Sequence, residues 1–238
     1  MRLFKNVKEA FPEVAHIWQP LPDDEYVKTN TVKLGGRLML HCTQGSTVRY
    51  LGGKGGIWDN DQLGPIATMF SIEKDGTIYQ YFDEDFWAYA SGCGAEYDKK
   101  SIHVEMGNRA FIKNINGKYY WLAGSKWTAY DGTPVKSTAP FQGYTYWDPY
   151  PWEQVTAMAK LAAYLIYNHG IPLEFNNDIK YIGPNLKQKG VLSHSNVSLQ
   201  RCDPGPAFPY GTFEELTRKH FLELCNKHGY PIYGEKKK

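Results

Sequence analysis

Polar and apolar side chains alternate along short segments of the chain, and the alternation predicts strands. Residues 101–106 alternate strictly, which places His103 and Glu105 together on the face opposite the apolar one. A short apolar run at 37–40 predicts a buried strand that ends at His41. A strand that carries a histidine and a glutamate on one face is a candidate site strand.

Two β-rich runs at 67–72 and 77–82 surround an Asp-Gly pair, which predicts a hairpin. Residues 107–150 contain an Asn-Gly turn and many aromatic side chains, and we interpret them as a β-rich insertion. Residues 1–33 have mixed polarity, and we expect an N-terminal extension that packs on the domain. The prediction for residues 1–238 is thus a single domain.

Helical periodicity predicts two longer helices near the C-terminal half of the chain. Residues 152–168 place apolar side chains on one face, and Gly170 suits the position just after a helix end. The second predicted helix covers 212–227, with Thr212 as N-cap and Glu215 completing a capping box. Strands and helices together predict an α/β or α+β fold.

Composition excludes several classes of protein. The 238 residues carry 27 Lys+Arg and 25 Asp+Glu, a net charge of +2, whereas a dedicated nucleic-acid binder is expected to be strongly basic. No apolar run reaches the ~18 residues of a membrane helix, so we expect no membrane insertion. The first residues lack the apolar core of a signal peptide, so we expect synthesis in the cytoplasm without one. The 4 scattered cysteines predict reduced thiols.

Four motifs follow one another in a recognisable order. They are His-Cys-Thr at 41–43, Ser-Ile-His-Val-Glu at 101–105, His-Ser-Asn-Val at 194–197 and Asp-Pro-Gly-Pro-Ala-Phe-Pro at 203–209. In this order the chain resembles the zinc-dependent N-acetylmuramoyl-L-alanine amidases, whose fold is shared with peptidoglycan recognition proteins and phage endolysins. The resemblance covers about residues 34–220, with 107–145 as an apparent insertion.

The resemblance implies a Zn²⁺ site held by His41, His194 and Asp203. Two imidazoles and a carboxylate suit a catalytic zinc ion, because three protein ligands leave a position for water. The family places Glu105 beside that water as general base and then as proton donor to the leaving amine. Arg201 stands where the family usually has lysine, and it would stabilise the oxyanion.

Several residues keep more than one interpretation. Cys202 precedes Asp203 directly and could replace it as third ligand, although the alignment favours Asp203. His103 could contact substrate, hydrogen-bond Glu105 or have a structural role. The candidate substrate-binding residues are Arg49, Trp58, Tyr89 and His103, and further candidate sugar-stacking residues are Trp87, Trp121, Trp127 and Trp147.

The fold implied by the resemblance is a mixed central β-sheet flanked by helices, with zinc in a surface cleft. The implied activity is hydrolysis of the amide between N-acetylmuramic acid and L-alanine in peptidoglycan, of the endolysin type that lyses the bacterial cell wall. The alternatives are a cytosolic amidase that recycles muropeptides and a non-catalytic peptidoglycan-binding module. We expect peptidoglycan or a muropeptide as the partner, no nucleic acid, and a monomer.

Overall fold

The computed structural model describes residues 3–29 and 35–231. Its central sheet has the order β1-β4-β3-β5-β2-β11 and consists of β1 (His16–Trp18), β2 (Arg37–Cys42), β3 (Phe70–Ile72), β4 (Ile78–Gln80), β5 (Ser101–Met106) and β11 (Gly190–Ser193). The helices are α1 (Val7–Ala10), α2 (Ile57–Asn60), α3 (Ala95–Asp98), α4 (Trp152–His169), α5 (His194–Val197) and α6 (Tyr210–His228). The mixed α/β architecture predicted from the sequence is confirmed.

The central sheet is mixed because one edge runs against the rest. Strands β3, β5, β2 and β11 are parallel neighbours, whereas β4 pairs antiparallel with β3 and parallel with β1. The β3–β4 pair is the hairpin predicted around the Asp-Gly turn. Strand β1 belongs to the segment expected to pack on the domain; of this segment, residues 1–2 and 30–33 lie outside the described residues.

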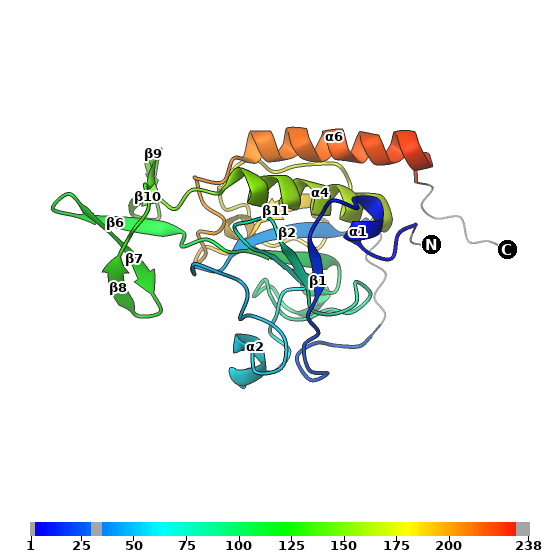
Figure 1. Cartoon of the computed structure of the whole chain (residues 1–238), viewed down its shortest axis with the longest axis horizontal. Coiled ribbons are helices and arrows are strands. Elements are labelled where there is room, and N and C mark those ends of the chain that lie inside the picture. The colour runs from blue at the N-terminus through cyan, green and yellow to red at the C-terminus, as the bar shows by residue number, and fades with distance from the viewer. Residues whose placement is uncertain (1–2, 30–34, 232–238) are drawn as a thin grey trace.

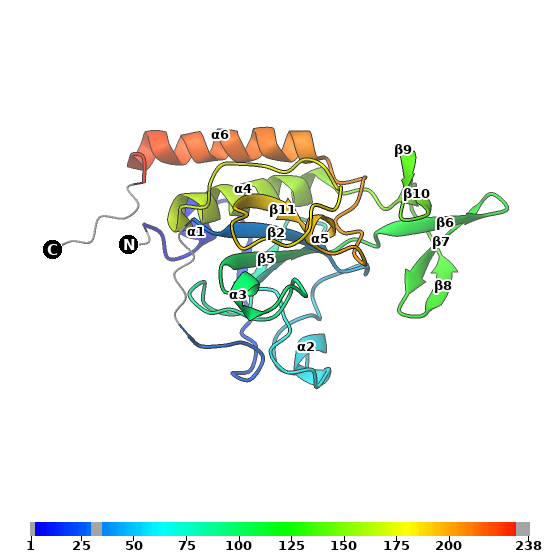
Figure 2. The same cartoon turned by 180° about the vertical axis from the view of Figure 1, so that it is seen from behind.

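The long helices α4 and α6 lie on one side of the central sheet, and the short helices α2 and α3 lie on the other (Figures 1 and 2). Helix α4 is buried on almost every face, because it is enclosed between the sheet and α6. It ends at Gly170, which adopts the left-handed conformation with φ of 61°. Among the described residues, no helix combines the length and apolarity needed to span a bilayer.

Helix α6 begins earlier than the sequence predicts. Its N-cap position is Pro209, no side chain caps it, and Thr212 lies within its first turn. Proline suits a helix start because its ring presets φ and it lacks the N–H that would be left unsatisfied there. The predicted capping box of Thr212 and Glu215 is therefore wrong.

Residues 107–150 contain a second sheet, which projects from the main body (Figures 1 and 2). Its order is β8-β7-β6-β10-β9, with β6 (Phe111–Ile115), β7 (Lys118–Ala123), β8 (Lys126–Ala129), β9 (Val135–Phe141) and β10 (Tyr144–Trp147). At its base, the buried ring of Trp147 packs against Gly205, and the Gln142 side chain donates to the carbonyl oxygens of Leu199 and Arg201. The projecting sheet thus contacts the loop that carries Arg201 and Asp203.

Candidate functional site

Three of the predicted site residues lie at the carboxyl ends of neighbouring parallel strands, and Arg201 and Asp203 lie on the loop that precedes α6. His41 and Glu105 lie opposite each other in the register between β2 and β5. His194 follows directly after β11, the other neighbour of β2. Because parallel strands end at the same edge of a sheet, this topology gathers residues that are distant in sequence into one place.

The alternation of side chains along β2 shows on which side of the central sheet the site lies. Leu38, Leu40 and Cys42 belong to the main core together with residues of α4. Successive strand residues point to opposite faces, so His41 faces away from α4. Cys42 is two residues from Leu40 and lies in the same core, on the face of β2 opposite that of His41.

Two local arrangements hold His194 and Asp203 in place. The Asn196 side chain accepts a hydrogen bond from the Ser193 N–H at 2.8 Å and donates to the carbonyl oxygens of Asp178 and Lys180. The Ser195 N–H donates to the Asp203 carbonyl oxygen at 3.1 Å. Asn196 therefore orders the turn that presents His194.

His41, His194 and Asp203 form a buried cluster of potential metal ligands. One ligand atom from each residue lies within 4.8 Å of the others. The two Nδ1 atoms of His41 and His194 are 2.9 Å apart, and Asp203 Oδ2 is 3.1 Å from the Nδ1 of His194 and 3.5 Å from that of His41. The three side chains aim their donor atoms at one point, as a metal site requires.

The protonation states of this cluster suit cation binding. Burial, and then the neighbouring His194, lower the pKa of His41 to about 3, which keeps its imidazole neutral. Burial alone would raise the pKa of Asp203, but His194 and His41 hold it below its usual range. A neutral imidazole and an ionised carboxylate are the forms that bind a metal.

Glu105 lines the same pocket as the cluster. The pocket has a volume of about 210 Å³ and is bordered by His41, Glu105, His194, Arg201 and Asp203. Burial, and then the charge of Asp203, raise the pKa of the Glu105 carboxyl well above its usual range, whereas Arg201 opposes the rise. The buried Glu105 Oε2 makes no hydrogen bond to any part of the chain that the structure describes.

The predicted substrate-binding residues divide into two groups. Trp58 and Tyr89 line the pocket, and the Tyr89 side chain is 39% exposed. Arg49 does not line it, because its guanidinium lies 3.4 Å from Asp75 and borders a different hollow. His103 lies behind the pocket, where its Nδ1 is 2.9 Å from His41 Nε2.

The other candidates do not line this pocket. Trp87 and Trp147 are buried, so they are unavailable for stacking on a sugar. Trp121 and Trp127 belong to the projecting sheet. The Cys202 thiol is not part of the donor cluster, and burial raises its pKa to about 12, which disfavours the thiolate that binds metal.

The sequence analysis did not identify two residues that lie near the cluster. Asp98 Oδ1 lies 3.1 Å from His103 Nε2, and the carbonyl oxygen of Ser91 lies 3.2 Å from His194 Nε2. The alternation at 101–106 gave one indication of this contact, because it placed His103 on the same face of the strand as Glu105. Nothing in the sequence pairs this histidine with a particular carboxylate.

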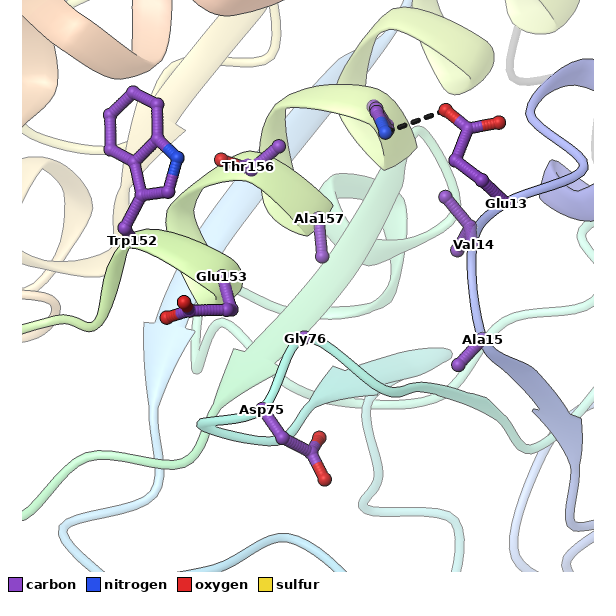
Figure 3. Close-up of a pocket in the computed structure, with 10 residues that line it drawn as sticks. Glu13, Val14, Ala15, Asp75, Gly76, Trp152, Glu153, Thr156 and Ala157 are labelled. Atoms are coloured by element: carbon purple, nitrogen blue, oxygen red, sulfur yellow. Dashed lines mark hydrogen bonds and ion pairs between the residues drawn. The ribbon is translucent and has the colours of Figure 1, made fainter.

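A second hollow lies between α4, the β3–β4 turn and the N-terminal segment (Figure 3). Its volume is about 330 Å³, and Trp152 and Asp75 are among its lining residues. An ion pair of 2.6 Å between Glu13 and Lys160 joins the N-terminal segment to α4 there. This hollow shares no lining residue with the pocket of Glu105, and its lining contains no imidazole or thiol.

Comparison with known structures identifies the fold. A mutant endolysin from Bacillus subtilis is 14% identical with a TM-score of 0.51, over 86% of this chain and 99% of that chain. The catalytic domain of XlyA is 13% identical with a TM-score of 0.52, over the same shares of 86% and 99%. At this identity the similarity shows a common fold.

Comparison with known sequences identifies the family. Halomucin from Haloquadratum walsbyi is 29% identical over 147 residues, which are 60% of this chain and 2% of halomucin. The chain thus matches only a small part of that protein. The profile of the N-acetylmuramoyl-L-alanine amidases (Amidase_2) matches residues 36–206, well over half of the chain. The resemblance predicted from the four motifs is confirmed, and the chain belongs to the N-acetylmuramoyl-L-alanine amidase family.

Proposed function

We propose that this protein is a zinc-dependent amidase that hydrolyses the bond between N-acetylmuramic acid and L-alanine in peptidoglycan. One observation carries the proposal: the buried donor cluster shares a pocket with Glu105, whose Oε2 is buried without a hydrogen bond among the described residues. A buried oxygen left without a partner is costly. Its retention is explained if substrate or water completes the site.

The donor set of His41, His194 and Asp203 fits zinc. Two imidazoles and one carboxylate are common ligands of catalytic zinc, and a fourth position stays free. When bound, zinc would act as a Lewis acid toward the scissile carbonyl and would acidify the attacking water. Calcium and magnesium fit less well, because they prefer all-oxygen ligand sets.

Glu105 supplies the proton transfers. Its carboxylate takes a proton from the attacking water, whose oxygen forms a bond to the carbonyl carbon. The same proton then passes to the amide nitrogen as the C–N bond breaks, which leaves a lactyl carboxylic acid and a free L-alanine amine. The acid then loses its remaining proton to the amine or to solvent. The raised pKa of Glu105 suits both steps, because the group is a stronger base than an ordinary carboxylate and can also hold a proton.

Arg201 is suited to stabilise the developing oxyanion. Its side chain lines the pocket, and its charge is close enough to oppose the rise in the pKa of Glu105. Guanidinium stays charged at all relevant pH values and donates through several N–H groups. Such donors are most effective when they are fixed before charge develops.

We further propose an endolysin-type role, in which the enzyme cuts the polymeric bacterial cell wall. An insoluble polymer can reach only a site with an accessible rim, and Ile66 and Tyr89 at the pocket are 41% and 39% exposed. Recycling of soluble muropeptides is the alternative, and its substrate would fit the same pocket. The substrate preference decides between the two roles.

The test combines zinc analysis with activity on two substrates, for the wild type and for Glu105→Ala. We expect near-stoichiometric zinc in both proteins, and release of L-alanine-terminated peptides from purified peptidoglycan by the wild type alone. Release from soluble muropeptides but not from intact wall would contradict the lytic role and support recycling. Zinc without release from either substrate would indicate a recognition module, and a folded protein without zinc would contradict the mechanism.

A further inference from the structure

The imidazole of His41 has partners on both ring nitrogens. Its Nδ1 points into the donor cluster, 2.9 Å from the Nδ1 of His194. Its Nε2 lies 2.9 Å from the Nδ1 of His103, on the side away from the cluster. The orientation of His41 is therefore set by a residue that is itself outside the donor cluster.

The contact continues from His103 to a carboxylate. His103 Nε2 lies 3.1 Å from Oδ1 of Asp98, and both side chains are buried. The Asp98 carboxylate also accepts hydrogen bonds from the backbone N–H groups of Ala90 at 3.3 Å and Ser91 at 3.2 Å. These contacts fix the carboxylate, so that it can orient His103.

The same segment reaches the second histidine ligand. His194 Nε2 lies 3.2 Å from the carbonyl oxygen of Ser91, while its Nδ1 faces Asp203. Ser91 therefore uses its N–H to hold Asp98 and its carbonyl oxygen to hold His194. Residues 90–98 thus influence both imidazoles of the cluster. Ser91 contacts His194 directly, whereas Asp98 contacts His103, which in turn contacts His41.

The outer partners of the two imidazoles indicate which ring nitrogen carries the proton when Nδ1 binds a metal. The Asp98 carboxylate lies at an ion-pair distance of 3.1 Å from His103 Nε2, which favours the proton of a neutral His103 on Nε2 and leaves its Nδ1 as an acceptor. His41 Nε2 then donates to His103, and its Nδ1 lone pair is free. A carbonyl oxygen also only accepts, so His194 Nε2 donates to Ser91 when its Nδ1 binds the metal.

We propose that Asp98, His103 and the Ser91 carbonyl group form an outer shell that fixes both ligand histidines with Nδ1 ready to bind the metal. Asp98 and His103 are positioning residues, since they act through His41. The inference rests on the proposed zinc site and explains why two buried polar side chains lie behind it. Outer-shell partners of this type typically change metal affinity by about 10- to 100-fold.

The test measures zinc affinity by competition with a chromophoric chelator. We expect His103→Phe, which removes the contacts of the imidazole with His41 and Asp98, to weaken zinc binding by about 10- to 100-fold. His103→Asn keeps an acceptor near the original Nδ1 position and should lose less affinity. Glu96→Gln is the matched control, because this carboxylate lies on the same α3 but is exposed and pairs with Lys99 at 2.6 Å.

A second measurement needs no metal and separates positioning from general stability. NMR of the labelled imidazole nitrogens in the zinc-free protein should show His41 protonated on Nε2 in the wild type and in Glu96→Gln. In His103→Asn the Nε2-protonated form should persist, and in His103→Phe the two tautomers should mix. Thermal unfolding of the zinc-free variants identifies any that do not fold. If His103→Phe does not fold, the comparison of His103→Asn with the wild type is the test.

Two outcomes separate the inference from the proposed function. If the wild type binds zinc and the folded His103 variants bind it equally well with an unchanged His41 tautomer, the outer shell is contradicted while the zinc site stands. If the wild type itself binds no zinc, the proposed function fails, and the inference that rests on it fails too.

Discussion

The side-chain amide of Gln142 donates to the backbone carbonyl oxygen of Arg201 at 2.7 Å. Gln142 belongs to the turn between β9 and β10, so this bond links the projecting sheet to the loop of the pocket. A second bond from the same amide reaches the Leu199 carbonyl oxygen at 3.3 Å. The insertion therefore supports the backbone next to a proposed catalytic side chain.

Shortening this side chain should loosen Arg201 without affecting the metal site. Gln142 has a φ of 49°, and asparagine tolerates this left-handed conformation, so Gln142→Asn is the suitable change. A hydrogen bond of this type contributes about 0.5–1.5 kcal/mol, which corresponds to a fall in kcat of up to about tenfold. Steady-state kinetics on a muropeptide measure the fall, with the exposed Lys136→Ala on β9 as control. Unchanged kinetics would show that the contact has no catalytic role.

Replacement of Glu105 should separate catalysis from stability. Glu105→Gln removes the proton acceptor, and the loss of a general acid–base group typically costs about 100- to 10,000-fold in rate. The folded pKa of Glu105 is raised, so the zinc-free wild type holds a proton that the unfolded chain releases above about pH 4.5. Its free energy of unfolding should therefore fall, relative to Glu105→Gln, as the pH rises from that value toward neutrality.

Chemical unfolding of both zinc-free proteins across this pH range tests the second part. Glutamine has nearly the same shape and carries no charge to bury, so the variant should be the more stable protein at neutral pH. An equal pH dependence of the two proteins would contradict a raised pKa at Glu105.

His41 should make the zinc-free protein sensitive to acid. The unfolded chain titrates this imidazole near pH 6.5, whereas burial holds the folded pKa at about 3. Between these values the unfolded chain binds a proton that the folded protein does not, so the free energy of unfolding falls as the pH falls. The slope is at most about 1.4 kcal/mol per pH unit.

This slope is measured by unfolding of zinc-free wild type and His41→Gln between neutral pH and about pH 5. Above that pH Asp203 is ionised in both the folded and unfolded chains, because its folded pKa is lowered and its unfolded value is about 3.9. The wild type should lose stability more steeply than the variant. Parallel curves would contradict a lowered pKa at His41 in the folded protein.

The glycine two residues after Asp203 should tolerate no side chain. Gly205 has a φ of +86°, and a Cβ atom there would lie 2.8 Å from the ring of Trp147. Gly205→Ala should therefore lower the free energy of unfolding by roughly 1–3 kcal/mol. Gly211→Ala is the control, because a Cβ at Gly211 meets nothing within 4 Å and alanine favours a helix. A thermal shift of the same size in both variants would contradict the proposed contact.

Much of the site could be predicted from the sequence because its parts lie in short motifs. The strand ending at His41, the alternation around Glu105 and the segment from His194 to Asp203 each carry their own local signal. Their convergence follows from the parallel order of β5, β2 and β11. The resemblance to the amidase family had already grouped these residues into one predicted site.

The remaining features depend on contacts between distant parts of the chain. The partner of His103 is Asp98, and no local pattern selects that carboxylate over the neighbouring Glu96. Trp147 was a candidate for sugar stacking, but its ring is buried against Gly205 through the folding of the insertion. Arg49 follows the strand of His41 closely in sequence, yet its loop carries it toward Asp75.

The central claim is tested most directly by mass analysis of the products from a defined N-acetylmuramoyl peptide that begins with L-alanine. The account predicts a single cut that adds one water and yields N-acetylmuramic acid and the intact peptide with a free alanine amine. The reaction should stop when zinc is removed by a chelator and return when zinc is restored. A cut within the peptide, or the same cut at full rate in the chelator, would contradict the account.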